Sequence, residues 1–150
     1  KAMDLFHEEE LQKLEAERRL ETMKLEVLIN QVNPHFLFNT LNVIGGMAML
    51  ESAHTTEKMI IALSNLFRYN LKNSSSEAAL AQELNVVRDY MYIQQMRFGE
   101  RLQFDIECRL EESKATIPTF TFQPLVENAI IHGLAPKEEG GKIRIKVWED

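Results

Sequence analysis

Apolar residues recur with helical spacing through the first part of the chain. Residues 4–32 contain no glycine or proline and are rich in Glu, Leu, Lys and Arg. Heptad positions a and d of this segment are occupied by Leu11, Leu14, Leu25, Leu28 and Val32. Arg18 and Glu21 fall on the same seam, where they weaken a coil and help to set its register. The pattern predicts a long helix: a parallel dimeric coiled coil, which the seam favours, or a single solvated helix.

A helical hairpin is predicted next. The apolar pattern continues from Phe36 to about Leu50, and after a polar break at 51–55 a second amphipathic set predicts a helix over roughly residues 56–72. Because the break is short, the two helices should run antiparallel. One hairpin has too little core of its own, so two hairpins from two chains should form a dimeric four-helix bundle. Residues 73–76, Asn-Ser-Ser-Ser, are typical of a linker.

The second half of the chain mixes helix and strand patterns. A third helix is expected over 81–98, ending near Gly99, and residues 102–108 alternate apolar and polar side chains as a half-buried strand does. Residues 117–118 suit an edge segment, because proline is excluded from central strands. Pro124 suits the first turn of a helix over 125–132 that Gly133 would end. After a loop at 136–141, alternation over 143–147 predicts a last strand, so we expect a layered α/β domain with an incomplete sheet.

Composition narrows the class of protein. The 150 residues carry a net charge of −6 without a cluster of Lys and Arg, which argues against direct nucleic-acid binding. The single cysteine, Cys108, excludes an intramolecular disulfide and suits a reducing compartment. No apolar run approaches the roughly 20 residues that span a bilayer. The chain stops directly after a strand-like run, which suggests a fragment of a longer protein.

Pro34 and His35 form the first candidate site. Proline inside a helix removes a hydrogen bond and clashes with the carbonyl one turn back, here that of Asn30, at a cost of ~3 kcal/mol. The heptad would place His35 at the next d position, so we expect Pro34 to kink one long helix and to turn the imidazole outward, beside the amides of Asn33 and Asn39. The alternative is that Pro34 starts a new helix and His35 is a surface residue of its first turn.

Glu127, Asn128 and His132 form the second candidate site, on the short helix after Pro124. Asn128 and His132 are four residues apart and share a helical face. Oxygen ligands beside an imidazole suit Mg²⁺ that keeps several waters and phosphates. Taken alone, such residues near a helix end are more often caps or surface side chains.

Two motifs together resemble a known family. The first run, residues 31–42, contains Asn-Pro-His-Phe-Leu-Phe-Asn, and it is followed by Leu-Ser-Asn-Leu-Phe-Arg-Tyr-Asn at 63–70 and by Arg-Phe-Gly at 97–99. These runs resemble the LytS-type (internal-region) sensor histidine kinases. Residues 123–133, Gln-Pro-Leu-Val-Glu-Asn-Ala-Ile-Ile-His-Gly, are similar to the N box of the GHKL ATPase superfamily. The resemblance covers the chain from about Glu26 onward.

The resemblance implies a role for each candidate residue. His35 would accept the γ-phosphoryl group of ATP, and Asn39 looks like the amide that positions water for phosphatase activity in related families. Asn128 would bind Mg²⁺, His132 would approach the phosphates, and Glu127 would orient a ligand or accept a proton. An acidic residue follows the acceptor in commoner histidine kinases, whereas Phe36 does so here, so the base that acts on His35 is unassigned. The adenine-binding Asp-x-Gly motif and the glycine-rich lid would follow the last strand, and the 150 residues stop before them.

The expected fold is therefore mainly α: a coiled-coil signalling helix at 1–28, a dimerisation and phosphoacceptor hairpin at 29–73, and the first part of an α/β GHKL-type ATP-binding domain at 80–150. The implied function is that of an ATP- and Mg²⁺-dependent sensor histidine kinase of a two-component system. Its implied partners are a second copy of the chain and a DNA-binding response regulator. The resemblance also implies a membrane sensor region upstream, with this portion at the cytoplasmic face of a bacterial inner membrane. By itself the fragment is expected to be inactive. The alternatives are a non-catalytic coiled-coil module that dimerises and transmits signals, and a structural helical scaffold.

Overall fold

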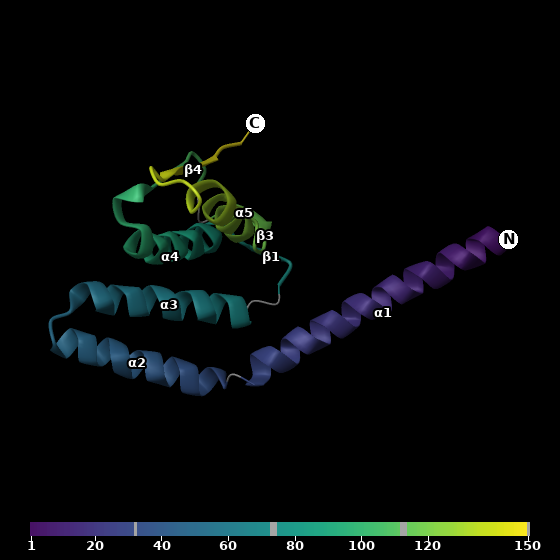
Figure 1. Cartoon of the computed structure of the whole chain (residues 1–150), viewed down its shortest axis with the longest axis horizontal. Coiled ribbons are helices and arrows are strands. Elements are labelled where there is room, and N and C mark those ends of the chain that lie inside the picture. The colour runs from purple at the N-terminus through teal and green to yellow at the C-terminus, as the bar shows by residue number, and fades with distance from the viewer. Residues whose placement is uncertain (32, 73–74, 112–113, 150) are drawn as a thin grey trace. The chain divides into compact units, whose positions relative to one another are not determined.

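The computed structural model describes residues 1–31, 33–72, 75–111 and 114–149, and within them the side chains of all but residues 26, 28–31 and 72. The chain divides into two compact units, Lys1–Thr40 and Leu41–Asp150. Helices dominate and are accompanied by two small sheets, so the expectation of a mainly α chain is confirmed (Figure 1).

The first unit begins with α1 (Ala2–Gln31). The seam residues Leu11, Leu14 and Leu25 are exposed by 59%, 51% and 59% in the single chain. Leu28 and Val32, the remaining seam residues, lie outside the described side chains. The long helix is as expected, and its pairing into a coiled coil stays a prediction.

A break, rather than a kink, precedes the motif that contains His35. α1 ends at Gln31, and α2 (Pro34–Leu50) begins at the proline itself. The expectation that Pro34 lies within one long helix and clashes with the carbonyl of Asn30 is therefore wrong, and the alternative, a new helix, is correct. The physical reason is that the first residue of a helix needs no backbone N–H, and the fixed φ of proline already suits that position. The heptad phase of α1 consequently does not extend to His35.

The second unit begins with the remainder of the predicted hairpin. From Leu41 onward α2 packs against α3 (His54–Lys72), which begins two residues earlier than expected. Gly45 lies so close to α3 that a Cβ placed on it would be 3.3 Å from Cγ2 of Ile60. The contact and the short connection confirm that the helices run antiparallel (Figure 1). Whether two hairpins pair into a bundle stays a prediction.

The segment after α3 is attached to the rest of the second unit. Residues 73 and 74 of the predicted linker lie outside the described residues. β1 (Glu77–Ala79) pairs antiparallel with β3 (Thr116–Pro118), with Ala78 opposite Ile117. The edge segment at 117–118 is thereby confirmed, whereas the pairing of β1 was not predicted.

The α/β part consists of α4 (Leu80–Phe98), η1 (Gly99–Arg101), β2 (Leu102–Cys108), α5 (Phe122–Asn128), η2 (Ala129–Leu134) and β4 (Gly141–Val147). β2 and β4 run parallel, with Leu102 opposite Gly141 and Cys108 opposite Val147. Gly99 ends α4 with a φ of 61°, as the sequence predicted. Gly133 does not end the next helix, because the chain continues beyond α5 as η2, a π-helical segment that runs through Leu134.

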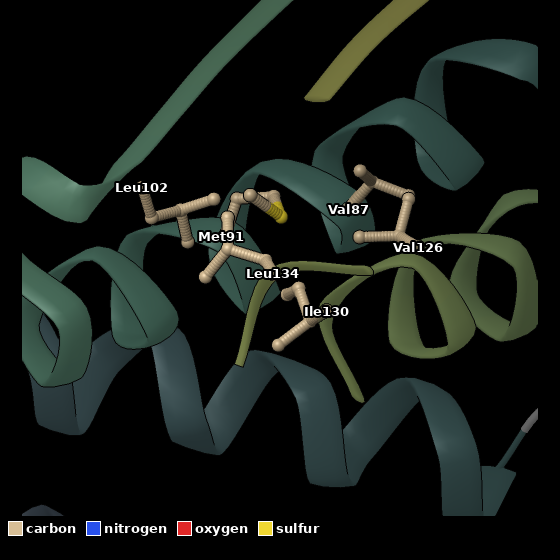
Figure 2. Close-up of a cluster of buried hydrophobic side chains, with 6 residues drawn as sticks. All are labelled: Val87, Met91, Leu102, Val126, Ile130 and Leu134. Carbon is tan, nitrogen blue, oxygen red and sulfur yellow. The ribbon is translucent and has the colours of Figure 1, made fainter. Parts of the chain in front are cut away.

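Six buried side chains form the core of this part. Figure 2 shows Val87 and Met91 of α4 pointing toward residues of β2, α5 and η2, and the cluster comprises Val87, Met91, Leu102, Val126, Ile130 and Leu134. Each is at most 3% exposed. Val126, Ile130 and Leu134 are spaced four residues apart, so this face of α5 and η2 is fixed against α4 and the sheet. Of the residues between them, Glu127 is half-buried and the others are exposed.

Candidate functional site

The turn that carries His35 is built from neighbouring residues. Asn33 precedes Pro34 and caps α2: its side-chain Oδ1 accepts from the backbone N–H of Phe36 at 3.3 Å, and its carbonyl accepts from the N–H of Leu37 at 3.0 Å. Asn33 as cap and Pro34 as first helical residue place His35 in the first turn of α2, where its side chain is exposed. The imidazole is thus accessible, although the reason is the helix start and not a kink.

Asn39, one turn after His35, contacts the imidazole directly. Its Nδ2 lies 3.3 Å from Nδ1 of His35. Which of the two groups donates depends on the tautomer of the ring, because either face of the amide can meet Nδ1. The placement of His35 beside the amide of Asn39 is therefore present, one turn apart on α2.

The residues of the second candidate site lie where α5 ends and η2 begins. Glu127 is half-buried, and Asn128 and His132 are exposed. Within the described part of the chain, neither Asn128 nor His132 has a side-chain hydrogen bond or an ion pair. The polar side chains of Asn128 and His132 lie at the surface, whereas Val126 and Ile130 are held in the core (Figure 2).

The π-helical form of η2 was not predicted. The N–H of Ala135 donates to the carbonyl of Ile130 at 2.8 Å, five residues back, which is the hydrogen bond that defines this wider turn. π-helical segments are rare in proteins, and those that occur often lie at functional sites. His132 therefore lies on a π-helical turn that directly follows Asn128, the last residue of α5.

Glu127 belongs to a polar cluster that the sequence analysis missed. Its Oε1 accepts from Nε2 of Gln123 at 3.1 Å. Burial raises the pKa of Tyr90 on α4, and the negative charge of Glu127 raises it further, while Arg97 and a hydrogen bond with Gln94 act in the opposite direction. Oε1 of Gln94 and Oε1 of Gln123 are buried without a hydrogen-bond partner in the described structure. The carboxylate is thus held by Gln123, one turn earlier on α5, and its charge acts on Tyr90 of α4.

The donor set fits Mg²⁺ bound to a nucleotide better than an ion held by protein alone. Mg²⁺ is usually bound by one or two protein oxygens together with phosphates and waters. The amide oxygen of Asn128 and the carboxylate of Glu127 are ligands of that kind. Among the described residues, no group of three or more His, Cys, Asp or Glu side chains could hold a metal ion. The residues present therefore fit a metal that arrives with phosphates.

The two groups of candidate residues belong to different units. His35 and Asn39 lie in Lys1–Thr40, whereas Glu127, Asn128 and His132 lie in Leu41–Asp150.

Asn33 could have been recognised from the sequence, because Asn followed by Pro is typical of a cap and first helical residue. Gln123 and Tyr90 carry no such local pattern. None of the helices in the described part of the chain is both long and apolar enough to cross a membrane.

Comparison with known proteins identifies the family. A family model described as histidine kinase matches residues 23–102. The sensor histidine kinase BtsS of Escherichia coli K12 is 41% identical over 122 residues, which are 81% of this chain and 22% of that protein. Sensor histidine kinase YpdA of the same strain is 40% identical over 129 residues, 84% of this chain and 22% of YpdA.

A third relative comes from a different bacterium. Sensor histidine kinase YesM of Bacillus subtilis is 38% identical over 123 residues, 82% of this chain and 21% of YesM. The chain thus spans about a fifth of the length of these curated relatives. The matched region contains the turn around His35, and the resemblance to the LytS-type sensor kinases rests on the same residues. The chain belongs to the histidine kinase family, in its LytS-type internal region.

Proposed function

We propose that this chain is part of an ATP-dependent sensor histidine kinase of a two-component system, in which His35 is the phosphoacceptor. The observation that carries the proposal is the exposed imidazole of His35, which is fixed by the capped first turn of α2 and by Asn39 at 3.3 Å. Relatives with about 40% identity over most of the chain are named sensor histidine kinases, which supports the same activity for the parent protein.

In the proposed reaction a ring nitrogen of His35 attacks the γ-phosphorus of ATP. An N–P bond forms, the bond to the bridging oxygen breaks, and the electron pair leaves with ADP. Bound Mg²⁺ neutralises charge on the phosphates, and such transfer depends mainly on positioning and electrostatics. Asn128 provides the oxygen ligand for the metal, Glu127 orients a ligand or accepts a proton, and His132 approaches the phosphates.

Asn39 is the residue that we propose sets the reactive nitrogen. With Nδ2 toward the ring, the proton lies on Nε2 and the lone pair on Nδ1 is engaged. Turning the amide over presents Oδ1 to an Nδ1–H group, which leaves the lone pair of Nε2 free. The amide thereby takes the place of the acidic neighbour that the commoner kinases have, and Phe36 at that position has no such capacity. A second role of Asn39, in positioning water for phosphatase activity, is compatible with the same geometry.

We propose that the parent works as a homodimer. The exposed seam residues of α1 and exposed apolar side chains of α2, such as Met47 at 55%, support a coiled coil at 1–28 and pairing of hairpins at 29–73. Residues 80–150 would then form the first part of a GHKL-type ATP-binding domain. Sedimentation equilibrium of the 150-residue chain at tens of micromolar should give a dimer, and a monomer would contradict this arrangement.

The remaining parts of the proposal rest on the family. The phosphoryl group would pass from His35 to a response regulator that binds DNA. The parent would be anchored by a sensor region in a bacterial inner membrane, with this portion on the cytoplasmic face. The 150 residues contain no Asp-x-Gly motif after β4, so the chain alone should bind ATP poorly and lack autokinase activity.

The test compares two substitutions on α5 in the full-length parent. Asn128→Ala removes the proposed metal ligand and should abolish Mg²⁺-dependent, acid-labile labelling by ATP. Leu125→Ala is the matched control, because Leu125 is 63% exposed on the same helix and lies outside the proposed ligand set. Labelling of Asn128→Ala at the rate of the parent would contradict the assignment. A parent that takes no label at all would favour a non-catalytic dimerisation module.

A further inference from the structure

Glu83 carries a carboxyl group in a position that is almost completely buried. It lies on α4 and is 1% exposed. Its Oε1 accepts a hydrogen bond from the hydroxyl of Tyr69 on α3 and a second one, at 2.8 Å, from the backbone N–H of Phe120. Its Oε2 is buried and has no hydrogen-bond partner in the described structure. Since burying a carboxyl group is unfavourable unless it is well bonded, a single oxygen that joins three separate segments is a feature to explain.

The segment that contains Phe120 is held by several further contacts. Phe120 has a φ of 59°, a conformation that bulky side chains rarely adopt. Its ring packs edge-to-face on Tyr69 with centroids 5.6 Å apart. Thr119, beside it, donates from Oγ1 to the carbonyl of Ser75 at 2.7 Å and from its N–H to the carbonyl of Ser76 at 3.0 Å. The short connection between β3 and α5 is thus fixed to α3, to α4 and to the chain leaving α3.

This connection leads directly into the helix of the candidate site. α5 begins at Phe122, two residues after Phe120, and carries Glu127 and Asn128. No side-chain cap was found for α5, whose preceding residue Thr121 already has helical φ and ψ. The position of the helix start therefore depends on the contacts made by Phe120 rather than on a local cap.

We propose that Glu83 is a positioning residue that holds the start of α5 against α3 through Phe120 and Tyr69. The polar joint of Tyr69, Glu83 and Phe120 couples the second helix of the hairpin to the helix that carries Glu127 and Asn128. The functional part of this inference rests on the proposed kinase activity, whereas the joint itself can be tested without it. Movement of α3 would reach the nucleotide residues through this joint.

Matched substitutions separate the joint from simple packing. Glu83→Gln keeps an oxygen that can accept from Phe120, and Glu83→Met keeps the approximate size but removes both acceptors. Glu83→Met leaves the donors of Tyr69 and Phe120 without an acceptor, so its stability should fall. Tyr69→Phe removes only the hydroxyl and keeps the ring contact with Phe120. It tests the joint if Glu83→Met does not fold. Tyr92→Phe, on α4 but outside the joint, is the control.

The first measurement is amide hydrogen exchange of the 150-residue chain by NMR. The N–H of Phe120 should exchange about tenfold faster in Glu83→Met, because it loses its hydrogen-bond acceptor. Tyr69→Phe should show a smaller increase, and Glu83→Gln and Tyr92→Phe should resemble the parent chain. Unchanged exchange of Phe120 in both Glu83→Met and Tyr69→Phe would show that the joint does not exist in solution.

The second measurement is the KM for Mg-ATP in autophosphorylation of the full-length parent. Loss of a residue that orients a ligand-bearing element should raise this KM on the order of tenfold in Glu83→Met, with Glu83→Gln close to the parent. A purely structural role would lower the fraction of folded enzyme and leave KM unchanged, and that result would overturn the positioning role. A parent that takes no label would contradict the proposed function instead, while the exchange measurement would still decide on the joint.

Discussion

The turn around His35 and the helix around Asn128 are positioned in different ways. Residues within four positions of His35, namely Asn33, Pro34 and Asn39, provide the cap, the helix start and the contact with the ring. Asn128, in contrast, lies on α5, which packs Val126 into the core and follows a segment that is hydrogen-bonded to α4. The proposed acceptor site can thus be encoded in one short motif, whereas the residues proposed to bind the nucleotide require a folded domain around them.

The largest expected effect is a loss of stability when a core side chain of η2 is shortened. Ile130 is 2% exposed and its neighbour Ile131 is 57% exposed, both on η2. Ile130→Ala should lower the free energy of unfolding of the second unit by about 2–5 kcal/mol, because it removes buried methyl groups and leaves a cavity. Ile131→Ala should change it by no more than about 0.5 kcal/mol. Urea unfolding of the 150-residue chain measures both, and equal losses would contradict the burial assigned to η2.

A smaller effect is expected at the turn around His35. Proline at a position whose φ it already fits stabilises a fold by restricting the unfolded chain, so Pro34→Ala should lower stability by about 0.4–1 kcal/mol. A kinked helix would give the opposite sign, with a gain of up to ~3 kcal/mol. The backbone N–H groups of Phe36 and Leu37 donate to Asn33, so their hydrogen exchange should become faster when the helix start is destabilised. A higher melting temperature for Pro34→Ala would restore the kink interpretation.

The smallest expected effect is a pH dependence of stability that arises from Asp89, which lies where α4 packs on α3. Burial raises the pKa of Asp89 above its usual value of 3.8, and a hydrogen bond with Asn65 partly offsets the shift. The folded chain therefore binds this proton more tightly than the unfolded chain, so the stabilisation is complete at low pH and is lost as pH rises through the folded pKa. Asp89→Asn should melt slightly higher than the parent chain near neutral pH, with the difference shrinking on acidification. The exposed Glu100→Gln should show no such trend, and a constant difference for Asp89→Asn would contradict the assignment.

Regular elements were predictable where side-chain periodicity was complete. β2 was expected at 102–108 and is found at Leu102–Cys108. One face of the strand is at least partly buried, and the alternation of apolar and polar side chains follows from that. α4 was recognised by its apolar face, but the burial of Glu83 on the same helix was not. The partners of Glu83 are 14 and 37 residues away in the sequence, so no local pattern could indicate them.

The errors in prediction have local physical causes. Pro34 was assigned to a helix interior because apolar spacing continues on both sides of it, although Asn33-Pro34 also fits a cap and a first helical residue. Gly133 was expected to end a helix, but the burial of Leu134, at 3% exposure, continues the packed face beyond the glycine. The identity of the site residues came from the motifs and not from geometry, and their chemical roles stay proposals.

The measurement that tests the central claim most directly is the site of phosphorylation in the full-length parent. His35 and His54 are both exposed and lie in the first turns of α2 and α3, which makes His54 a matched control. After incubation with ATP and Mg²⁺, acid-labile phosphate should be present on the parent and on His54→Gln and absent from His35→Gln, with peptide mass spectrometry locating it on His35. Phosphate that persists in His35→Gln would contradict the account.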